Sequence, residues 1–424
     1  MKLLHVNAAY YPFFGGAEIY TQAISERLAC GGHSVTVVTT NAAEVEYFWN
    51  PHKRHVSPGR ECLNGVEVIR CQVNHLPLSP WSFHLLRRLA TSIGRLPFTC
   101  RSPFAIRILR CLAPFMPSVP EIESTLAALP GPFDLVHGIN VALEWPLLAA
   151  WRYARRHGIP FIATPLVHVG EYGRYDVLIN YVMPHQLEAL RDADAVIVQT
   201  NVERQALARL GVAEERLHVL GMGIDLNELQ GGEAQRFRNR HNLDGPIVTF
   251  LGVATYGKGV FHLVQALERL WAQGHDSYLI IAGTLVDEFV YFYNRLPPTT
   301  RRRVLLLGRI DSQTKRDLLA ATNVFVLPSR IDSFGIAYLE AWAYSKPVIG
   351  ARAGGVPDVI EDGVDGLLVE FGDVEGLAAA IEALLADPAR AQAMGQRGRA
   401  KVEARYTWDH IYARLWAVYE QVAG

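Results

Sequence analysis

The stretch from residue 323 to residue 350 reads NVFVLPSRIDSFGIAYLEAWAYSKPVIG. Its apolar run at Asn323–Leu327 predicts a buried strand, and Pro347–Gly350 predicts a second one. Between the two strands, Ala341–Tyr344 has the composition of a helix. A strand that leads through a turn and a helix to another strand is the repeating unit of a parallel α/β sheet.

The turn within this stretch carries two acids, Asp332 and Glu340, on either side of Phe334-Gly335. The first amides of a helix have no intrahelical partner, and the helix dipole is positive there. We therefore expect the amides of Phe334 and Gly335 to face a phosphate, with Ser333 as a further donor-binding residue, while the two acids accept hydrogen bonds from hydroxyl groups. This combination suits a nucleotide-activated sugar. The alternative is an ordinary capped helix with one buried glutamate.

The whole chain has 424 residues, half of them apolar and a fifth charged, which predicts two globular domains. Its formal charge of −1 argues against a nucleic-acid partner. We expect a cytoplasmic protein, because the sequence starts directly with a strand and has no apolar run of about 20 residues. The cysteines form no CxxC pair, so neither a zinc site nor a disulfide framework is indicated; they are Cys30, Cys62, Cys71, Cys100 and Cys111.

Short apolar runs recur along the chain in two series, separated by helical patterns. Continuous apolarity predicts strands that are buried on both faces, as in a parallel sheet. The first series is Leu3–Val6, Val35–Thr39, Leu135–His137, Pro160–Ala163, Ala195–Thr200 and Leu217–Leu220. The second series is Ile247–Leu251, Tyr278–Ala282, Val304–Leu307, Val324–Leu327, Val348–Gly350 and Leu367–Val369.

The two series predict an α/β protein with two doubly wound, Rossmann-like domains that face each other across a cleft. We place these domains at residues 1–225 and 226–404, and we expect residues 405–424 to form a helix that packs back on the first domain. The polar stretch Asn227–Asp244 is interpreted as the crossing point, with a linker and a solvated helix. The active site is expected in the cleft, at the carboxyl ends of the strands.

One region departs from this pattern, because Val68–Pro120 contains no acidic residue. We interpret residues 75–120 as a basic helical insertion. An anionic membrane surface is one partner that basic and aromatic residues on helices fit, which would place the protein at the inner face of a membrane. The alternative is an insertion whose arginines are simply solvated. The arginines are Arg70, Arg87, Arg88, Arg95, Arg101, Arg107 and Arg110, and the aromatic residues are Trp81, Phe83, Phe98, Phe104 and Phe115.

Taken together, these stretches resemble glycosyltransferase family 4, whose members are retaining transferases of the GT-B fold. The resemblance covers nearly the whole chain and is densest from Gly245 to Val369. The motifs that carry it are Gly15-Gly16-Ala17-Glu18, residues 32–37, residues 194–198, residues 221–225, Gly252 with Lys258-Gly259, residues 332–340, residues 354–358 and residues 362–366.

The resemblance implies transfer of a sugar from a nucleoside diphosphate, with a UDP-sugar favoured over a GDP-sugar. Negative charge builds on the leaving diphosphate, and Lys258 is the residue expected to stabilise it. Family members usually carry an arginine just after the glycine at position 252, whereas this chain has Val253. Arg309, Arg330 or the backbone amides at Gly16 and Gly335 are then left to meet the second phosphate charge.

The resemblance also assigns the two acids. Glu340 matches the acid that accepts hydrogen bonds from the ribose hydroxyls. Asp332 matches the acid, usually a glutamate, that contacts the donor sugar, and its shorter side chain is interpreted as a difference in specificity.

His168 follows a strand and is the histidine expected to contact the donor sugar, with His137 as its rival. Gly15 and Gly16 lie after the first strand, where backbone amides can approach a phosphate closely. No Gly-x-Gly-x-x-Gly follows that strand, which argues against a nicotinamide oxidoreductase.

Retention is expected to proceed by a front-face mechanism, in which the departing phosphate helps to deprotonate the acceptor. No metal or other cofactor is expected in that scheme. The acceptor is a glycan, a lipid-linked sugar or a small molecule. Two other functions stay open: a catalytically weak paralogue that binds sugar nucleotides, and an epimerase or hydrolase on the same fold.

Overall fold

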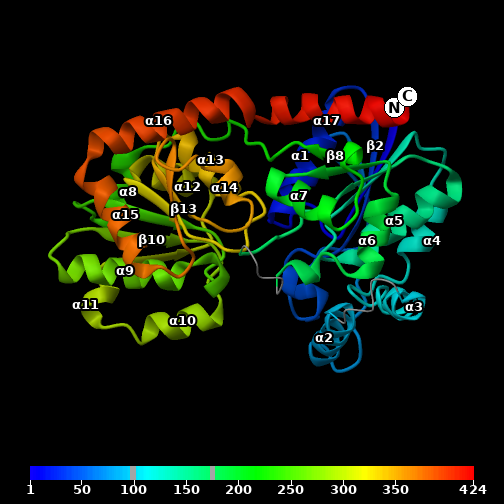
Figure 1. The fold of residues 1–424 in the computed structure, drawn as a ribbon, viewed down its shortest axis with the longest axis horizontal. Helices are drawn as coiled ribbons and strands as arrows, with labels where there is room; N and C mark the ends of the chain where they lie inside the picture. Colours follow the sequence, from blue (N-terminus) through cyan, green and yellow to red (C-terminus); the bar gives the residue numbers. More distant parts are fainter. Residues whose placement is uncertain (96–101, 172–176) are drawn as a thin grey trace. The chain divides into compact units, whose positions relative to one another are not determined.

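The computed structural model describes residues 1–95, 102–171 and 177–424 (Figure 1). The described chain forms two compact units. The first unit holds Met1–His168, Tyr175–Gly221 and Tyr412–Gly424. The second unit holds Val169–Arg174 and Met222–Ile411.

The first unit is built on one eight-stranded sheet in the order β3-β4-β2-β1-β5-β6-β7-β8. The pairing is parallel throughout except between β3 and β4, which are antiparallel. The strands are β1 (Lys2–Asn7), β2 (Ser34–Thr40), β3 (Gly59–Leu63), β4 (Val66–Cys71), β5 (Leu135–Ile139), β6 (Phe161–Thr164), β7 (Ala195–Val198) and β8 (Leu217–Val219).

Helices connect these strands. They are α1 (Gly16–Cys30), α2 (Trp81–Arg95), α3 (Pro103–Leu112), α4 (Ile122–Ala127), α5 (Glu144–His157), α6 (Pro184–Asp192) and α7 (Asn201–Arg209), with 3₁₀ turns η1 (Val45–Phe48), η3 (Leu178–Asn180) and η4 (Glu214–Arg216). The last helix, α17 (Trp408–Ala423), begins in the second unit and continues into the first.

The second unit has a six-stranded, fully parallel sheet in the order β11-β10-β9-β12-β13-β14. Its strands are β9 (Ile247–Leu251), β10 (Tyr278–Ala282), β11 (Val304–Gly308), β12 (Val324–Leu327), β13 (Val348–Ala351) and β14 (Gly366–Val369). Its helices are α8 (Ala234–His241), α9 (Val260–Ala272), α10 (Asp287–Asn294), α11 (Pro298–Arg301), α12 (Ser312–Ala321), α13 (Ile336–Ala343), α14 (Val356–Val359), α15 (Val374–Ala386) and α16 (Pro388–Arg405), with the 3₁₀ turn η5 (Tyr256–Lys258).

Each of the twelve predicted strands overlaps an observed strand, because continuous apolar runs are buried on both faces of the sheets. The structure adds β3 and β4. Most of β3 is exposed at the edge of the sheet, and β4 contains the charged residues Glu67 and Arg70, so neither strand is a continuous apolar run.

Two interpretations of the sequence need correction here. Arg70 does not belong to a helical insertion: it lies buried in β4, and its Nε donates to the Glu61 carboxylate of β3 at 2.5 Å. Arg101 and Phe98, which belonged to the same interpretation, lie outside the described residues.

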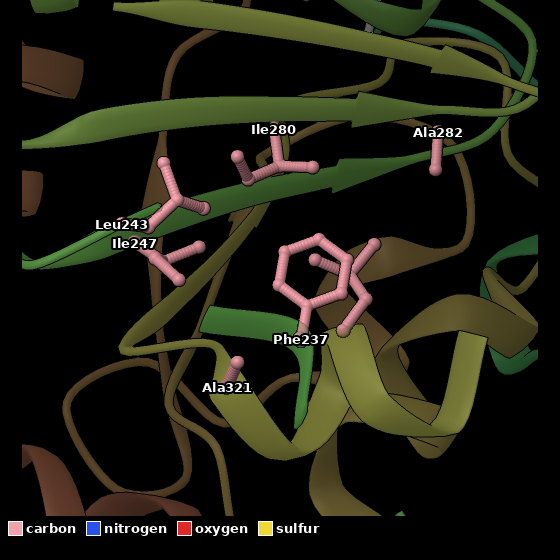
Figure 2. Packing of buried hydrophobic residues seen from close by; sticks show 7 residues of the cluster. Phe237, Leu243, Ile247, Ile280, Ala282 and Ala321 are labelled. Atoms are coloured by element: carbon pink, nitrogen blue, oxygen red, sulfur yellow. The ribbon is translucent and has the colours of Figure 1, made fainter. Parts of the chain in front are cut away.

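The stretch Asn227–Asp244 is also more than a linker with a solvated helix. Within it, α8 buries the Phe237 ring among Ile247, Ile280 and Leu318 of the second unit's core. Figure 2 shows this ring between the helices and the strands of the sheet. Two arginines of α8 are also bonded, since Arg236 pairs with Asp317 and Arg238 donates to the Asn323 side chain.

Candidate active site

The second sheet has a topological switch point between β9 and β12. The chain runs outward from β9 through β10 to β11 and then returns to the other side of β9 with β12. The two connections that leave β9 and β12 therefore diverge to opposite faces of the sheet. Open α/β sheets bind their ligands at the carboxyl ends of the strands beside such a switch point.

The loop after β9 brings Lys258 to the carboxyl ends of these two strands. It ends at Gly259, whose φ of +78° is a left-handed conformation. A Cβ atom at Gly259 would lie 2.2 Å from the Pro328 carbonyl oxygen, so a glycine is required for the loop to lie against the loop after β12. The Arg330 amide donates to the Gly257 carbonyl at 3.0 Å and links the same two loops.

The loop after β12 places Asp332 opposite Lys258. The Lys258 Nζ atom lies 2.5 Å from Asp332 Oδ1, and both side chains are largely buried. The loop after β13 holds the Asp332 backbone, because the Gly355 amide donates to the Asp332 carbonyl at 2.9 Å. The ion pair therefore rests on loops from three neighbouring strands.

The turn into α13 differs from the sequence prediction in one respect. The helix begins at Ile336 rather than Ala341, so the second half of the acidic motif, including Glu340, is itself helical. Gly335 is the N-cap residue with φ of +89°, and a Cβ atom there would lie 2.4 Å from the Tyr338 ring. Phe334 is buried and meets the Tyr406 ring edge to face at 5.3 Å, while Ser333 is half-buried.

Glu340 has a partner that sequence reasoning missed. Lys315 lies in the first turn of α12, which follows β11, and its Nζ atom donates to Glu340 Oε1 at 2.7 Å. The two acids of the motif are therefore each bonded to a lysine at this edge of the sheet. A lysine in the first turn of a helix carries no distinctive pattern, so only the pairing in space reveals Lys315.

The other two cations that the sequence offered have different surroundings. Arg330 pairs with Glu171 at 3.1 Å, and its guanidinium lies 5.1 Å from the centre of the Phe371 ring. Arg309 lies after β11, two strands away from β9, and is exposed. Its Nε donates to Thr284 Oγ1 at 3.0 Å.

Val253 lies close to this Thr284–Arg309 contact. The backbone amide of the next residue, Ala254, donates to the Thr284 carbonyl at 2.8 Å, and the Val253 side chain is exposed. Arg309 is thus the cation that lies near the position where the resembled family usually has its arginine. That Arg309 binds a phosphate stays a prediction.

Three predicted residues belong to the first unit: Gly15, Gly16 and His168. The first sheet has its own switch point between β1 and β5, and Gly15 is the N-cap residue of α1 after β1. A Cβ atom at Gly15 would lie 2.4 Å from Glu18 Oε2, so the Glu18 carboxyl lies directly against this glycine.

Glu18 is a second residue whose importance the sequence did not reveal. Its side chain is buried, and this burial raises the pKa of the carboxyl to about 7. An anion bound at the first amides of α1 would meet this carboxyl, and the protonated form would tolerate the anion better than the ionised form.

The two histidines of the sequence analysis have different environments. His168 is half-buried after β6 and stacks on Tyr181 with ring centres 4.8 Å apart. His137 is completely buried in β5, where Nδ1 lies 2.6 Å from the Tyr419 hydroxyl and Nε2 lies 2.7 Å from Thr164 Oγ1. His137 thus has a structural environment, and its burial holds its pKa well below the usual value.

Within the part of the chain that the structure describes, no three His, Cys, Asp or Glu side chains gather closely enough to hold a metal ion. The residues that the structure brings together at the second switch point are Lys258, Asp332, Ser333, Phe334, Gly335, Lys315 and Glu340. They offer two ammonium groups, two carboxylates and the first amides of one helix. This set can bind a molecule that carries both anionic groups and hydroxyls.

Comparison with known proteins identifies the family. The model of the glycosyl transferase 4-like domain matches residues 15–223, and the model of glycosyl transferases group 1 matches residues 232–401. Alpha-maltose-1-phosphate synthase from Mycolicibacterium smegmatis is 32% identical over 254 residues, which span 55% of this chain and 65% of that relative, just under two thirds of its length.

Two further relatives extend the comparison. D-inositol 3-phosphate glycosyltransferase from Xylanimonas cellulosilytica is 30% identical over 295 residues, which span 64% of this chain and 69% of that protein. The crystal structure of Anabaena Alr3699/HepE in complex with UDP-glucose has a TM-score of 0.70 and 18% identity, and the match covers 99% of this chain and 100% of that one. The chain belongs to the glycosyltransferases, and its two parallel-sheet domains have the GT-B fold.

Proposed function

We propose that this protein is a retaining glycosyltransferase that moves a sugar from a nucleoside-diphosphate sugar to a glycan, a lipid-linked sugar or a small-molecule acceptor. The donor is bound at the switch point between β9 and β12 of the second unit. The observation that carries this proposal is the Lys258–Asp332 ion pair, which lies at the carboxyl ends of those two strands.

In this proposal the ion pair exchanges partners when the donor binds. The Lys258 ammonium moves from Asp332 to the diphosphate, and the released Asp332 carboxylate accepts hydrogen bonds from the donor sugar. A unit charge pair at about 4 Å contributes roughly 4 kcal/mol at the effective dielectric constant near a protein surface. The pair thus keeps a cation in position without leaving an uncompensated charge in a largely buried site.

Glu340 also binds the donor, and it keeps its lysine partner. Its bond to Lys315 fixes the carboxylate in the middle of α13, and the ribose hydroxyls of the donor take up its remaining acceptor capacity. Lys315 stays within reach as a second positive charge. Ser333 and the amides of Phe334 and Gly335, in the turn that leads into α13, complete the phosphate site.

The chemical step needs stabilisation of the leaving diphosphate. The bond between the anomeric carbon and the phosphate oxygen breaks, and the acceptor oxygen bonds to the same face of the sugar. The acceptor proton passes to the departing phosphate oxygen. Protein cations neutralise the charge in this scheme, with no part for a metal ion.

A UDP-sugar is our favoured donor, with a GDP-sugar as the second choice. Support for uridine comes from Anabaena Alr3699/HepE, a structure of the same fold that was solved with UDP-glucose. A catalytically weak sugar-nucleotide binder and an epimerase or hydrolase remain the alternatives that an experiment must separate.

The test is nucleotide release from a panel of UDP-, GDP- and ADP-sugars, with and without mixed acceptors. Lys258→Ala and Glu340→Ala are the test variants, and the exposed residues Lys53 and Glu288 provide matched alanine controls. We expect acceptor-stimulated release from one donor, abolished in both test variants and retained in both controls. Release that needs no acceptor would favour the hydrolase, and the absence of both binding and release for every donor would refute the proposal.

A further inference from the structure

The helices α2 and α3 of the first unit pack against each other (Figure 1). Their apolar residues lie on two faces, one buried and one exposed. The inner face is ordinary core: Ala90 of α2 and Leu109 of α3 are buried in one cluster with Met116 and Met183. The outer face is the unusual one, because it is apolar and open to solvent.

The apolar residues of this outer face form a stripe. Trp81, Leu85 and Leu89 are 83%, 68% and 48% exposed, and their spacing of four residues puts them on one side of α2. Leu78, just before α2, and Phe104 of α3 are 86% and 73% exposed. Scattered surface leucines are normal, but a stripe of large side chains along one helix face indicates a partner.

The arginines of this region fall into two groups. Arg87 pairs with the buried Glu144, and Arg110 pairs with Glu188, so these two hold α2 and α3 to the rest of the unit. Arg88, Arg95 and Arg107 are exposed, and among the described residues no acid forms an ion pair with them.

We propose that this outer face of α2 and α3, defined by Leu78, Trp81, Leu85, Arg88, Leu89, Arg95, Phe104 and Arg107, docks on the surface of an anionic lipid bilayer. The apolar stripe enters the boundary between headgroups and acyl chains, and the arginines meet the anionic headgroups. None of the helices among residues 1–95, 102–171 and 177–424 is long and apolar enough to span a bilayer.

The charge pattern selects this occupant over a second copy of the chain. The segment from residue 68 to residue 120 contains arginines and no acid. Two copies of this face would bring like charges together, whereas a bilayer with anionic lipid offers the opposite charge over its whole surface. Docking on a bilayer does not depend on the proposed reaction. If the proposed function also holds, the acceptor is presented at a membrane.

The test is co-sedimentation of the whole protein with vesicles of phosphatidylcholine alone and of phosphatidylcholine with 30% phosphatidylglycerol. We expect binding to the anionic vesicles at low salt, which weakens strongly at 0.5 M salt because the Debye length shortens. Trp81→Ala with Leu85→Ala should abolish binding. The aromatic control is Tyr291→Ala, which removes an exposed ring from the second unit.

Charge is tested with a matched pair of double variants. Arg88→Gln with Arg107→Gln should weaken binding about 25-fold, since each arginine near an anionic surface contributes about fivefold. Arg156→Gln with Arg209→Gln removes the same charge from exposed positions on α5 and α7, and should leave binding unchanged. If the two double variants lost vesicle binding equally, net charge alone would explain the effect, and the proposal would be overturned.

Two further outcomes would also overturn it. One is the absence of binding to anionic vesicles at low salt. The other is self-association of the wild-type chain that Trp81→Ala with Leu85→Ala removes, because the face would then be an interface between copies. Calorimetric binding of the donor is measured on the same variants, so that a failure of the donor site is distinguished from a failure of docking.

Discussion

Lys258→Ala is the substitution that tests the candidate site most directly. In the structure the Lys258 ammonium lies 2.5 Å from Asp332 Oδ1, and the two side chains are only 20% and 13% exposed. If the ammonium stabilises the leaving diphosphate at about 4 Å, its loss removes roughly 4 kcal/mol at an effective dielectric constant of 20. This energy corresponds to a fall of about 10³ in kcat/KM.

The assay is the initial rate of nucleotide release with donor and acceptor, combined with calorimetric binding of the donor. Lys258→Ala also leaves the Asp332 carboxylate next to the diphosphate, so donor binding should weaken as well. Adding Asp332→Asn removes that repulsion, and we expect donor binding to recover in part while the rate stays low. Lys258→Arg keeps the charge and should retain more activity than Lys258→Ala.

The reasoning is refuted if Lys258→Ala stays within about tenfold of the wild type in kcat/KM. It is also refuted if Lys53→Ala, which removes an exposed lysine from the first unit, lowers the rate by the same factor.

Three further predictions concern the fold. Gly259→Ala should cost about 3 kcal/mol of stability, because φ is +78° there and the new Cβ would clash with a backbone carbonyl. Gly274→Ala is the control: φ is +91° but the surrounding space is open, so it should cost about 1 kcal/mol. Equal shifts of the two variants in thermal unfolding would contradict this. Tyr419→Phe removes the hydroxyl that bonds the buried residues His137 and His5, and should lower the free energy of unfolding in urea by about 2 kcal/mol. An unchanged free energy of unfolding would show that this hydroxyl is dispensable. Burial raises the pKa of Glu203 to about 7, so this carboxyl adds stability as the pH falls from about 7 toward 4.5. When the pH is lowered from 7.5 to 5.5, the free energy of unfolding of Glu203→Gln should therefore fall about 2 kcal/mol further than that of the wild type, because the variant lacks this gain; urea unfolding measures both. Equal changes in the two proteins would rule this out.

The sequence predicted much of the fold because burial on both faces of a parallel sheet leaves a local signal. Twelve strands were found from continuous apolar runs such as Ile247–Leu251. The edge strand β3 and its neighbour β4 were missed, since Arg70 interrupts the apolar pattern and finds its partner, Glu61, on the other strand. Sequence analysis assigns a charged residue to the surface, because the sequence does not show the partner that would allow its burial.

The candidate site was predicted in part for the same reason. Asp332 and Glu340 were recognisable because they lie in one short stretch, and Gly259 because its place next to Lys258 matches a family motif. Lys315 was not recognisable, since nothing near it in the sequence points to Glu340.

By itself, the sequence determined the class of the fold, the two series of strands and the stretches from which the second unit's site is built. These are local properties: an apolar run, a turn that needs glycine, and a pair of acids on a strand–turn–helix unit. Only the tertiary structure decided which side chains meet. The order β11-β10-β9-β12 places the loop of Lys258 beside that of Asp332, 74 residues further along the chain. Such pairs depend on the order of strands in the sheet, and a linear sequence does not state that order.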